Sequence, residues 1–349
     1  MIILYHDSLY LNTERTENVP REILGKNRSS VKLAVARLKA GEVSLFPDFT
    51  YLSEILDPGD LLLFNDSLML PSALWARESS SGKICRIHVG QPIDHGKYLA
   101  EIRPRSEFSA PWNKGEFSIL NTEIIANVVE RNREFPRYVE MTFPNLIDDM
   151  QKFLLRNGSP IFYEGITKAF DYSYYKNIFQ TKLGSSEYPS ASRPFSTKII
   201  NKTVKEGVRI STITLHCNLA SLERAEFEKS DVLLPEFYDV GGDTIENIEN
   251  AVASGNRVIA VGTTVARAII SAVSGGKLRS SSGVTRLKIG PDTDVFPLSG
   301  IITGVHDTDS SHHDLLSAFV GDQISMPLNR IVSTFGLDGH EFGDSVAII

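Results

Sequence analysis

One stretch in the C-terminal half of the chain combines glycine, threonine and arginine at a spacing that suits anion binding. Gly262, Thr263 and Thr264 follow the mainly apolar run 257–261, and Arg267 comes about one helical turn later. If a buried strand turns into a helix here, the first helical N–H groups lack internal partners and the helix dipole favours an anion. The two hydroxyls and the guanidinium then add donors. The segment predicts either a site for an anionic group or an ordinary strand-to-helix turn with a threonine cap.

Two histidines stand where predicted strands end. His216 ends the β-branched run 209–216, and His306 follows the run 301–305 directly. Ligands of open α/β sheets bind beside the carboxyl ends of the strands, and imidazole titrates near neutral pH. Both histidines are therefore candidate bases. The alternative for His216 is a partly buried histidine that is satisfied by the backbone.

A dense group of acids and histidines begins just before the predicted helix 311–320. Its members are Asp307, Asp309, His312, His313 and Asp314. These residue types resemble metal ligands, but their spacing matches no standard metal motif. Ser311 and Asp314 also fit a capping box, which explains one of the acids without a metal. We therefore expect no metal site here.

The composition is that of a globular protein with a substantial core. Of the 349 residues, 42% are hydrophobic, 23% charged and 9% aromatic, which argues against a disordered chain. The net charge of −7 gives no overall attraction for nucleic acid, so binding to RNA would depend on a local patch and is predicted to be weak. Cys85 and Cys217 are too few for a disulfide framework or a thiolate metal site.

The chain shows no sign of a membrane or export segment. No apolar run approaches the roughly 18 residues of a membrane span, and the apolar N-terminus is too short for a signal peptide. We therefore expect a cytoplasmic protein.

The patterning of the sequence changes twice and predicts two structural units. Short helices are expected in 29–38 and 49–56, whereas 59–143 consists of short strands divided by Gly, Pro and Asn turns. Such a series is typical of a compact barrel or sandwich. Strands and helices then alternate, as in a mostly parallel sheet covered by helices. The predicted architecture is an α/β main domain, formed by 1–58 and 144–349, with an inserted all-β, barrel-like domain at 59–143.

The individual elements follow from hydrophobic periodicity and turn residues. Strands are expected at 61–64, 84–89, 98–102, 117–120, 124–129, 138–143, 209–216, 257–261 and 301–305, helices at 146–154, 243–254, 264–273 and 311–320, and a surface loop at 277–283. Asp243 is the expected N-cap of the helix 243–254.

Two blocks of the sequence resemble one known family. They are Leu56 to Ser67, which reads LDPGDLLLFNDS, and Gly255 to Thr264, which reads GNRVIAVGTT and is followed by Arg267. Both are similar to the S-adenosylmethionine:tRNA ribosyltransferase-isomerases of queuosine biosynthesis. Weaker matches extend the resemblance along most of the chain; they include Arg28-Ser29-Ser30, Thr214-Leu215-His216, Ile301-Ile302-Thr303 with His306, and Phe342-Gly343-Asp344.

The resemblance implies a fold and a reaction. Enzymes of that family join the ribosyl portion of S-adenosylmethionine to an aminomethyl-deazaguanine base in tRNA, and adenine and methionine leave. It implies an α/β domain with an inserted β domain, S-adenosylmethionine as co-substrate and no metal. The candidate S-adenosylmethionine-binding residues are then Gly262, Thr263, Thr264, Arg267, Ser190 and Asp344, and the candidate catalytic residues are His216 and His306.

The sequence also departs from the family pattern. The family's PTAGLHF stretch is PSASRPF here, at Pro189–Phe195, so the family's histidine is replaced by Pro194. Arg193 adds a fixed cation beside a rigid turn and is predicted to hold an anionic group if the segment borders the site; a surface loop is the alternative. Three functions stay open: tRNA modification, a related reaction of S-adenosylmethionine on a small-molecule acceptor, and a non-catalytic ligand-binding relative.

Overall fold

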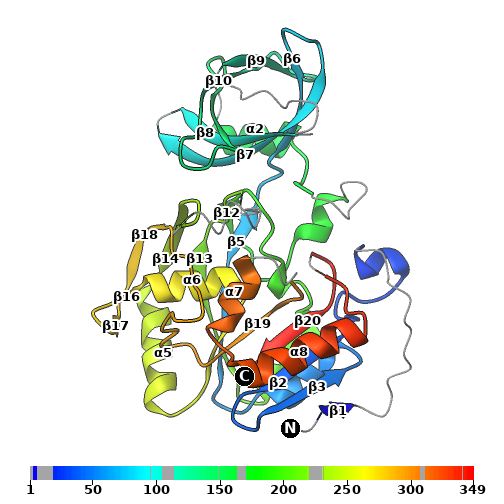
Figure 1. The fold of residues 1–349 in the computed structure, drawn as a ribbon, viewed down its shortest axis with the longest axis vertical. Helices are drawn as coiled ribbons and strands as arrows, with labels where there is room; N and C mark the ends of the chain where they lie inside the picture. Colours follow the sequence, from blue (N-terminus) through cyan, green and yellow to red (C-terminus); the bar gives the residue numbers. More distant parts are fainter. Residues whose placement is uncertain are drawn as a thin grey trace.

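The protein consists of a large mixed sheet with helices and a closed six-stranded barrel, which stands apart from the sheet in Figure 1. This confirms the predicted fold class. The computed structural model describes residues 3–5, 19–94, 96–103, 114–147, 149–162, 170–219, 230, 232–306, 311–339 and 341–349.

The described part of the large sheet has ten strands. In spatial order they are β1 (Ile3–Tyr5), β3 (Glu42–Phe46), β2 (Leu33–Arg37), β20 (Ser345–Ile348), β19 (Gly300–Gly304), β15 (Val258–Val261), β4 (Leu61–Asn65), β13 (Arg209–Leu215), β14 (Glu236–Val240) and β18 (Ser281–Thr285). The four adjacent strands β19, β15, β4 and β13 run parallel to one another. Their carboxyl ends therefore meet at one edge of the sheet. β20 runs antiparallel to β19 and parallel to β2.

Helices cover both faces of this sheet. They are α1 (Leu52–Ile55), α3 (Thr197–Lys205), α5 (Gly242–Ala253), α6 (Thr263–Ser271), α7 (Ser311–Ser317) and α8 (Asp322–Thr334). Alternate residues of β4 enter the two apolar cores. Leu61 and Leu63 belong to the core that also contains residues of α5, α6, α7 and α8, and Leu62 belongs to the core on the other face, with residues of α1 and α3. Because both faces are buried, the central strands are continuously apolar rather than alternating.

The barrel closes in the order β10-β11-β8-β7-β6-β9. Its strands are β6 (Ala73–Glu78), β7 (Ile84–Asp94), β8 (Lys97–Arg103), β9 (Gly115–Ile119), β10 (Ile125–Arg131) and β11 (Val139–Thr142). Helix α2 (Met150–Asn157) packs against the barrel core through Met150, Phe153 and Leu154. The predicted strands between 84 and 143 are confirmed, and β6 is an additional strand that the sequence pattern did not reveal.

An apolar contact joins the two units. Leu99 and Tyr138 of the barrel side share a buried cluster with Leu219 and Leu234 of the sheet side. The Tyr138 hydroxyl also donates to the Leu219 carbonyl at 2.9 Å. The barrel is therefore fixed to the sheet unit through described residues.

Short elements complete the architecture. β5 (Ser67–Met69) pairs in parallel with β12 (Lys182–Ser185), and β16 (Val273–Ser274) pairs with β17 (Lys277–Leu278). The 3-10 helices are η1 (Arg21–Leu24), η2 (Phe49–Tyr51), η4 (Tyr172–Tyr175) and η5 (Ser190–Ser192).

Three predicted elements were wrong. The expected helix at 29–38 contains strand β2 instead. Residues 33–36 of this strand are all buried, and a short, continuous apolar run cannot be distinguished from a buried helix by periodicity. The N-cap of α5 is Gly241 and not Asp243. Asp243 lies in the first turn, where its negative charge interacts favourably with the helix dipole. The expected loop at 277–283 contains β17 and the start of β18.

The two ends of the barrel unit also differ from the predicted bounds 59 and 143. The segment 61–64, expected as its first strand, forms β4 in the centre of the large sheet. Helix α2 lies beyond the expected end at 143 but packs on the barrel. We therefore propose that the inserted unit runs from β6 to α2, in place of the predicted 59–143.

Candidate functional site at the carboxyl edge of the sheet

The sequence blocks singled out above converge at the carboxyl ends of the four parallel strands. β13 leads into His216, β4 ends at Asn65, β15 leads into Gly262, and β19 ends two residues before His306. This is the edge at which open α/β sheets bind their ligands.

Asn65 joins three of these strand ends by hydrogen bonds. Its Oδ1 accepts from the N–H of Leu215 and from the N–H of Ser67, each at 3.0 Å. Its Nδ2 donates to the Leu215 carbonyl at 2.9 Å and to the Thr264 hydroxyl at 3.2 Å. The amide thus uses all four of its hydrogen-bonding positions. Because Asn65 is buried, the network fixes the start of α6 relative to the ends of β4 and β13.

His216 is held through one ring nitrogen. The Ser67 hydroxyl lies 2.7 Å from His216 Nδ1 and 2.6 Å from the Ser185 hydroxyl. The Ser185 hydroxyl in turn accepts from the N–H of Cys217 at 2.9 Å. Ser67 and Ser185 are fully buried, so the two serines set the orientation of the imidazole.

The ring of His216 packs closely on its neighbours. A Cβ atom at Gly184 would lie 2.6 Å from His216 Cε1, so the imidazole occupies the space that a side chain would need. The Phe237 ring stacks on it with a centroid separation of 5.6 Å. Burial lowers the pKa of His216, Asp66 raises it, and Lys182 lowers it further. His216 is therefore neutral at pH 7 and suited to accept a proton.

The start of α6 requires a glycine. Gly262 has a φ of +101°, and an added Cβ would lie 3.1 Å from Ala191 Cβ. Its N–H donates to the Ile302 carbonyl at 2.8 Å. Thr263 is buried, and Thr264 takes part in the Asn65 network. The strand-to-helix turn is therefore confirmed, and η5 packs against it.

Arg267 is buried and already engaged within the protein. Its guanidinium donates to a Glu236 carboxylate oxygen through NH1 and to the Leu287 carbonyl at 3.1 Å through Nε. The other Glu236 oxygen accepts from the N–H of Asn218 at 2.9 Å. Its Nη2 is buried without a hydrogen-bond partner among the described residues, and the ligand carboxylate predicted at Arg267 stays a prediction. The arginine ties α6 to β14.

His306 is far from His216. Three inter-strand spacings separate β19 from β13, which corresponds to about 14 Å between the strand ends. The Thr303 hydroxyl lies 3.0 Å from His306 Nε2, and the His312 ring stacks on His306 with a centroid separation of 4.4 Å. The two candidate bases therefore follow different strands of the sheet, β13 and β19.

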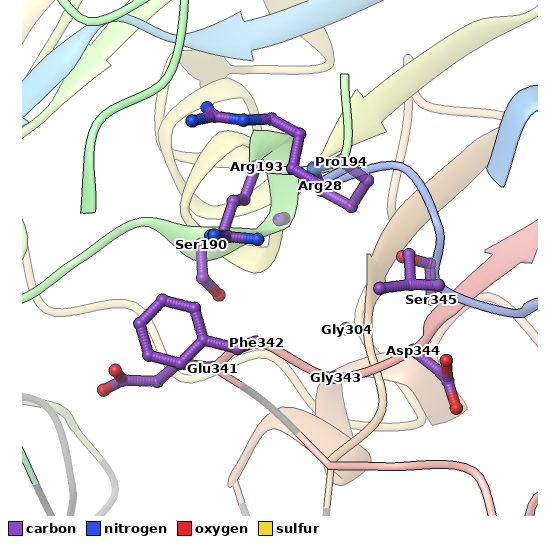
Figure 2. A pocket seen from close by; sticks show the side chains of 12 residues that line it. Arg28, Ser190, Arg193, Pro194, Gly304, Glu341, Phe342, Gly343, Asp344 and Ser345 are labelled. Carbon is purple, nitrogen blue, oxygen red and sulfur yellow. The ribbon is translucent and has the colours of Figure 1, made fainter. Parts of the chain in front are cut away.

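A small depression lies beside the end of β19, and Figure 2 shows the side chains that line it. Its lining residues are Arg28, Val31, Ser190, Ala191, Arg193, Pro194, Gly304, Glu341, Phe342, Gly343, Asp344 and Ser345. The structure thus brings together Ser190 and Asp344, two of the predicted ligand-binding residues, whereas Thr263, Thr264 and Arg267 are not part of this lining.

Asp344 has a structural role in the wall of the depression. Its carboxylate accepts from the N–H of Lys32 at 2.6 Å and from the N–H of Asp338 at 2.9 Å. Burial raises the pKa of Asp344, and these two N–H donors lower it. Its oxygens thus connect the start of β2 to the segment before β20.

Arg193 lines the depression. The sequence left two alternatives for its segment: a border of the site or a surface loop. Only 2% of the residue is exposed, so the alternative of a surface loop was wrong. Its NH2 group donates to Glu22 at 2.6 Å, and its Nε group donates to the Tyr174 carbonyl at 3.2 Å. The guanidinium carbon lies 4.8 Å from the centre of the Phe342 ring, above which Figure 2 shows it.

Glu341 is a functional candidate that sequence reasoning missed. It lines the depression, and its buried Oε2 has no hydrogen-bond partner among the described residues. Burial, together with the nearby Glu187, raises its pKa to about 8. No motif marks this residue, and only its position directly before the Phe342-Gly343-Asp344 match connects it with the site.

Within the described residues, no three His, Cys, Asp or Glu side chains could hold a metal ion. Asp307 and Asp309 of the predicted cluster lie outside the described residues. Cys85 and Cys217 are both buried free thiols. None of the described helices is long and apolar enough to cross a membrane.

The fold is that of an α/β protein with a barrel, and its candidate site lies at the carboxyl ends of the parallel strands. A sequence profile described as queuosine biosynthesis protein matches residues 10–348. The chain belongs to this family.

Named relatives agree with this membership. The S-adenosylmethionine:tRNA ribosyltransferase-isomerase of Halothermothrix orenii is 27% identical over 340 residues, which cover 95% of this chain and 97% of the relative. The protein of that name from Acaryochloris marina is 29% identical over 339 residues, covering 92% and 88%. The crystal structure of S-adenosylmethionine tRNA ribosyltransferase from Thermotoga maritima has a TM-score of 0.50 at 22% identity and covers 95% of this chain and 98% of that one. This structural likeness supports the fold.

Proposed function

We propose that the protein is an enzyme that transfers the ribosyl portion of S-adenosylmethionine to tRNA, with loss of adenine and methionine. The observation that carries the proposal is the family match over residues 10–348. The hydrogen-bond network of Asn65 supports it, because it connects the two best-matched blocks and His216 at one edge of the sheet.

His216 is the proposed base. The sulfonium of S-adenosylmethionine acidifies the adjacent ribose carbon, and a neutral imidazole can remove that proton. Ser67 holds Nδ1 at 2.7 Å, so the proton would be taken by Nε2. Such a positioned base typically contributes a factor of about 10² to 10⁴ in rate.

The other predicted residues take supporting roles in this proposal. Gly262, Thr263 and Thr264 present the N-terminus of α6 to the ligand, and Arg267 holds α6 against β14. His306, two residues beyond the end of β19, is the candidate for a second proton transfer.

A small-molecule acceptor is the second candidate for the same chemistry. The net charge of −7 and the replacement of the family's histidine by Pro194 favour it. A non-catalytic, ligand-binding relative is the third.

Product analysis separates the three. The protein is incubated with S-adenosylmethionine alone and with added tRNA that carries the unmodified base, and adenine and methionine are measured by chromatography. Release that requires tRNA supports the proposal. Release without tRNA identifies the small-molecule reaction, and binding without release in either mixture identifies the ligand-binding relative. His216→Asn should slow release by a factor of about 10² to 10⁴ and serves as the control for a contaminating nucleosidase.

A further inference from the structure

Two arginines beside the depression share a single acid. Glu22 accepts from Arg193 at 2.6 Å through one oxygen, and its other oxygen lies 3.2 Å from Arg28 NH2. The Arg28 NH1 group donates to the carbonyl of Lys176, which adds no charge. Two guanidiniums on one carboxylate leave one positive charge uncompensated within this triad. Both arginines line the depression, so the surplus charge is placed where it favours an anionic group.

An acid lies across from this charge. Glu341 lines the same depression, and Figure 2 shows its side chain beside the Phe342 ring, over which Arg193 lies. Its Oε2 is buried without a hydrogen-bond partner among the described residues, and so is the hydroxyl of Tyr188. A buried carboxyl oxygen that lacks a donor is costly, and a ligand that supplies the donor removes that cost.

We propose that this depression recognises an α-amino-acid zwitterion, with the ligand carboxylate at Arg28 and Arg193 and its ammonium group at Glu341. Under the proposed function, on which this inference rests, the zwitterion is the methionine end of S-adenosylmethionine.

This placement moves the carboxylate site away from Arg267. Arg267 does not line the depression, and its guanidinium is bound to Glu236 and to a backbone carbonyl. Arg28 is more accessible, because 26% of its side chain is exposed. The N-terminus of α6 stays next to the depression through the contact between Gly262 and Ala191.

A matched pair of ligands tests the proposal. S-Adenosylmethionine carries the amino-acid group, and 5′-methylthioadenosine lacks it. Their dissociation constants are measured by calorimetry for the wild type, Arg28→Gln and Glu341→Gln. Each variant should weaken S-adenosylmethionine about tenfold or more, as expected for a lost hydrogen bond between charged groups. Binding of 5′-methylthioadenosine should stay within about twofold. Arg133→Gln, at a side chain that is 92% exposed on the barrel side, is the matched control and should change neither.

The pH dependence gives a second readout. Glu341 must be ionised to hold an ammonium group, and in the empty protein its pKa is raised to about 8. The charged or titratable groups around it are Glu187, Tyr175 and Tyr188. Between pH 6 and 7.5, where an α-amino group stays protonated, the binding of S-adenosylmethionine should tighten by up to about tenfold per pH unit. Glu341→Gln should remove this slope.

The outcomes separate this inference from the proposed function. If the variants weaken both ligands equally, or neither, while the wild type binds S-adenosylmethionine, the zwitterion site is wrong and the proposed function stands. If the wild type binds neither ligand, the proposed function fails and the inference fails with it. Thermal melting of each variant shows whether a loss of affinity reflects a loss of folding.

Discussion

At the residue scale, the account depends on a neutral, oriented His216. His216→Asn should lower kcat by about 10² to 10⁴. Ser67→Ala should have a smaller effect, since it keeps the imidazole and removes the hydroxyl's two hydrogen bonds, to His216 and Ser185, each worth about 1 kcal/mol. Because burial lowers the pKa of His216, the rate should be constant above about pH 6.5 and fall only below it. Single-turnover rates from pH 5 to 8 check this.

The matched control is Ser72→Ala, because Ser72 is also fully buried but its hydroxyl donates to the Leu70 carbonyl. An unchanged rate in His216→Asn would remove His216 from the chemistry.

Glu341 also gives a prediction about stability. Its pKa is raised from 4.5 to about 8 in the folded protein, so the folded state keeps a proton that the unfolded chain loses. The contribution of Glu341 to the stability of the wild type should therefore fall as the pH rises from about 4.5 to about 8. Glu341→Gln should be no more stable than the wild type at pH 4 and increasingly more stable toward pH 8.5. Urea unfolding at these two pH values decides it; equal differences at both would contradict the raised pKa.

Some candidate site residues could be predicted from the sequence, and others could not. Gly262, Thr264 and His216 follow strands that periodicity predicted, so the sequence alone predicted their position at strand ends. The roles of Arg267 and Glu341 depend on contacts with Glu236 and Glu187, which lie far away in sequence. No local pattern contains such contacts.

At the element scale, the ion pair between Arg267 and Glu236 fixes α6 against β14. Arg267→Ala should destabilise the protein by about 3–5 kcal/mol, because it leaves Glu236 buried without its partner. Replacing both residues, as Arg267→Met with Glu236→Gln, should recover much of this loss. Urea unfolding of the two variants checks it. A double variant no more stable than Arg267→Ala would mean that the pair is not what holds the helix.

Strand and helix identity could be predicted best where turn residues bound the segment. The run 257–261 lies between two glycines, and it forms β15 as expected. Residues 29–38 have no such boundary pattern, and β2 is buried on both faces, so its apolar spacing resembled that of a helix. β4 was assigned to the barrel because its neighbours in sequence belong there, although its hydrogen-bonded neighbours are β13 and β15.

At the scale of the whole molecule, the charge argues for weak binding of tRNA. With a net charge of −7, affinity must come from a few local phosphate contacts, which release few counterions. Filter binding at physiological salt should give weak binding that decreases as salt is raised. Tight, saturable binding under these conditions would contradict the charge argument and strengthen the case for tRNA as the acceptor.

The central claim is that the ribosyl portion of S-adenosylmethionine, and not its methyl group, is transferred to tRNA. The most direct measurement uses two preparations of S-adenosylmethionine, one labelled in the ribose and one in the methyl group, with tRNA that carries the unmodified base. After incubation the tRNA is purified and its label is counted. The account predicts label in the tRNA from the ribose preparation and none from the methyl preparation. Label from the methyl preparation, or from neither, would contradict it.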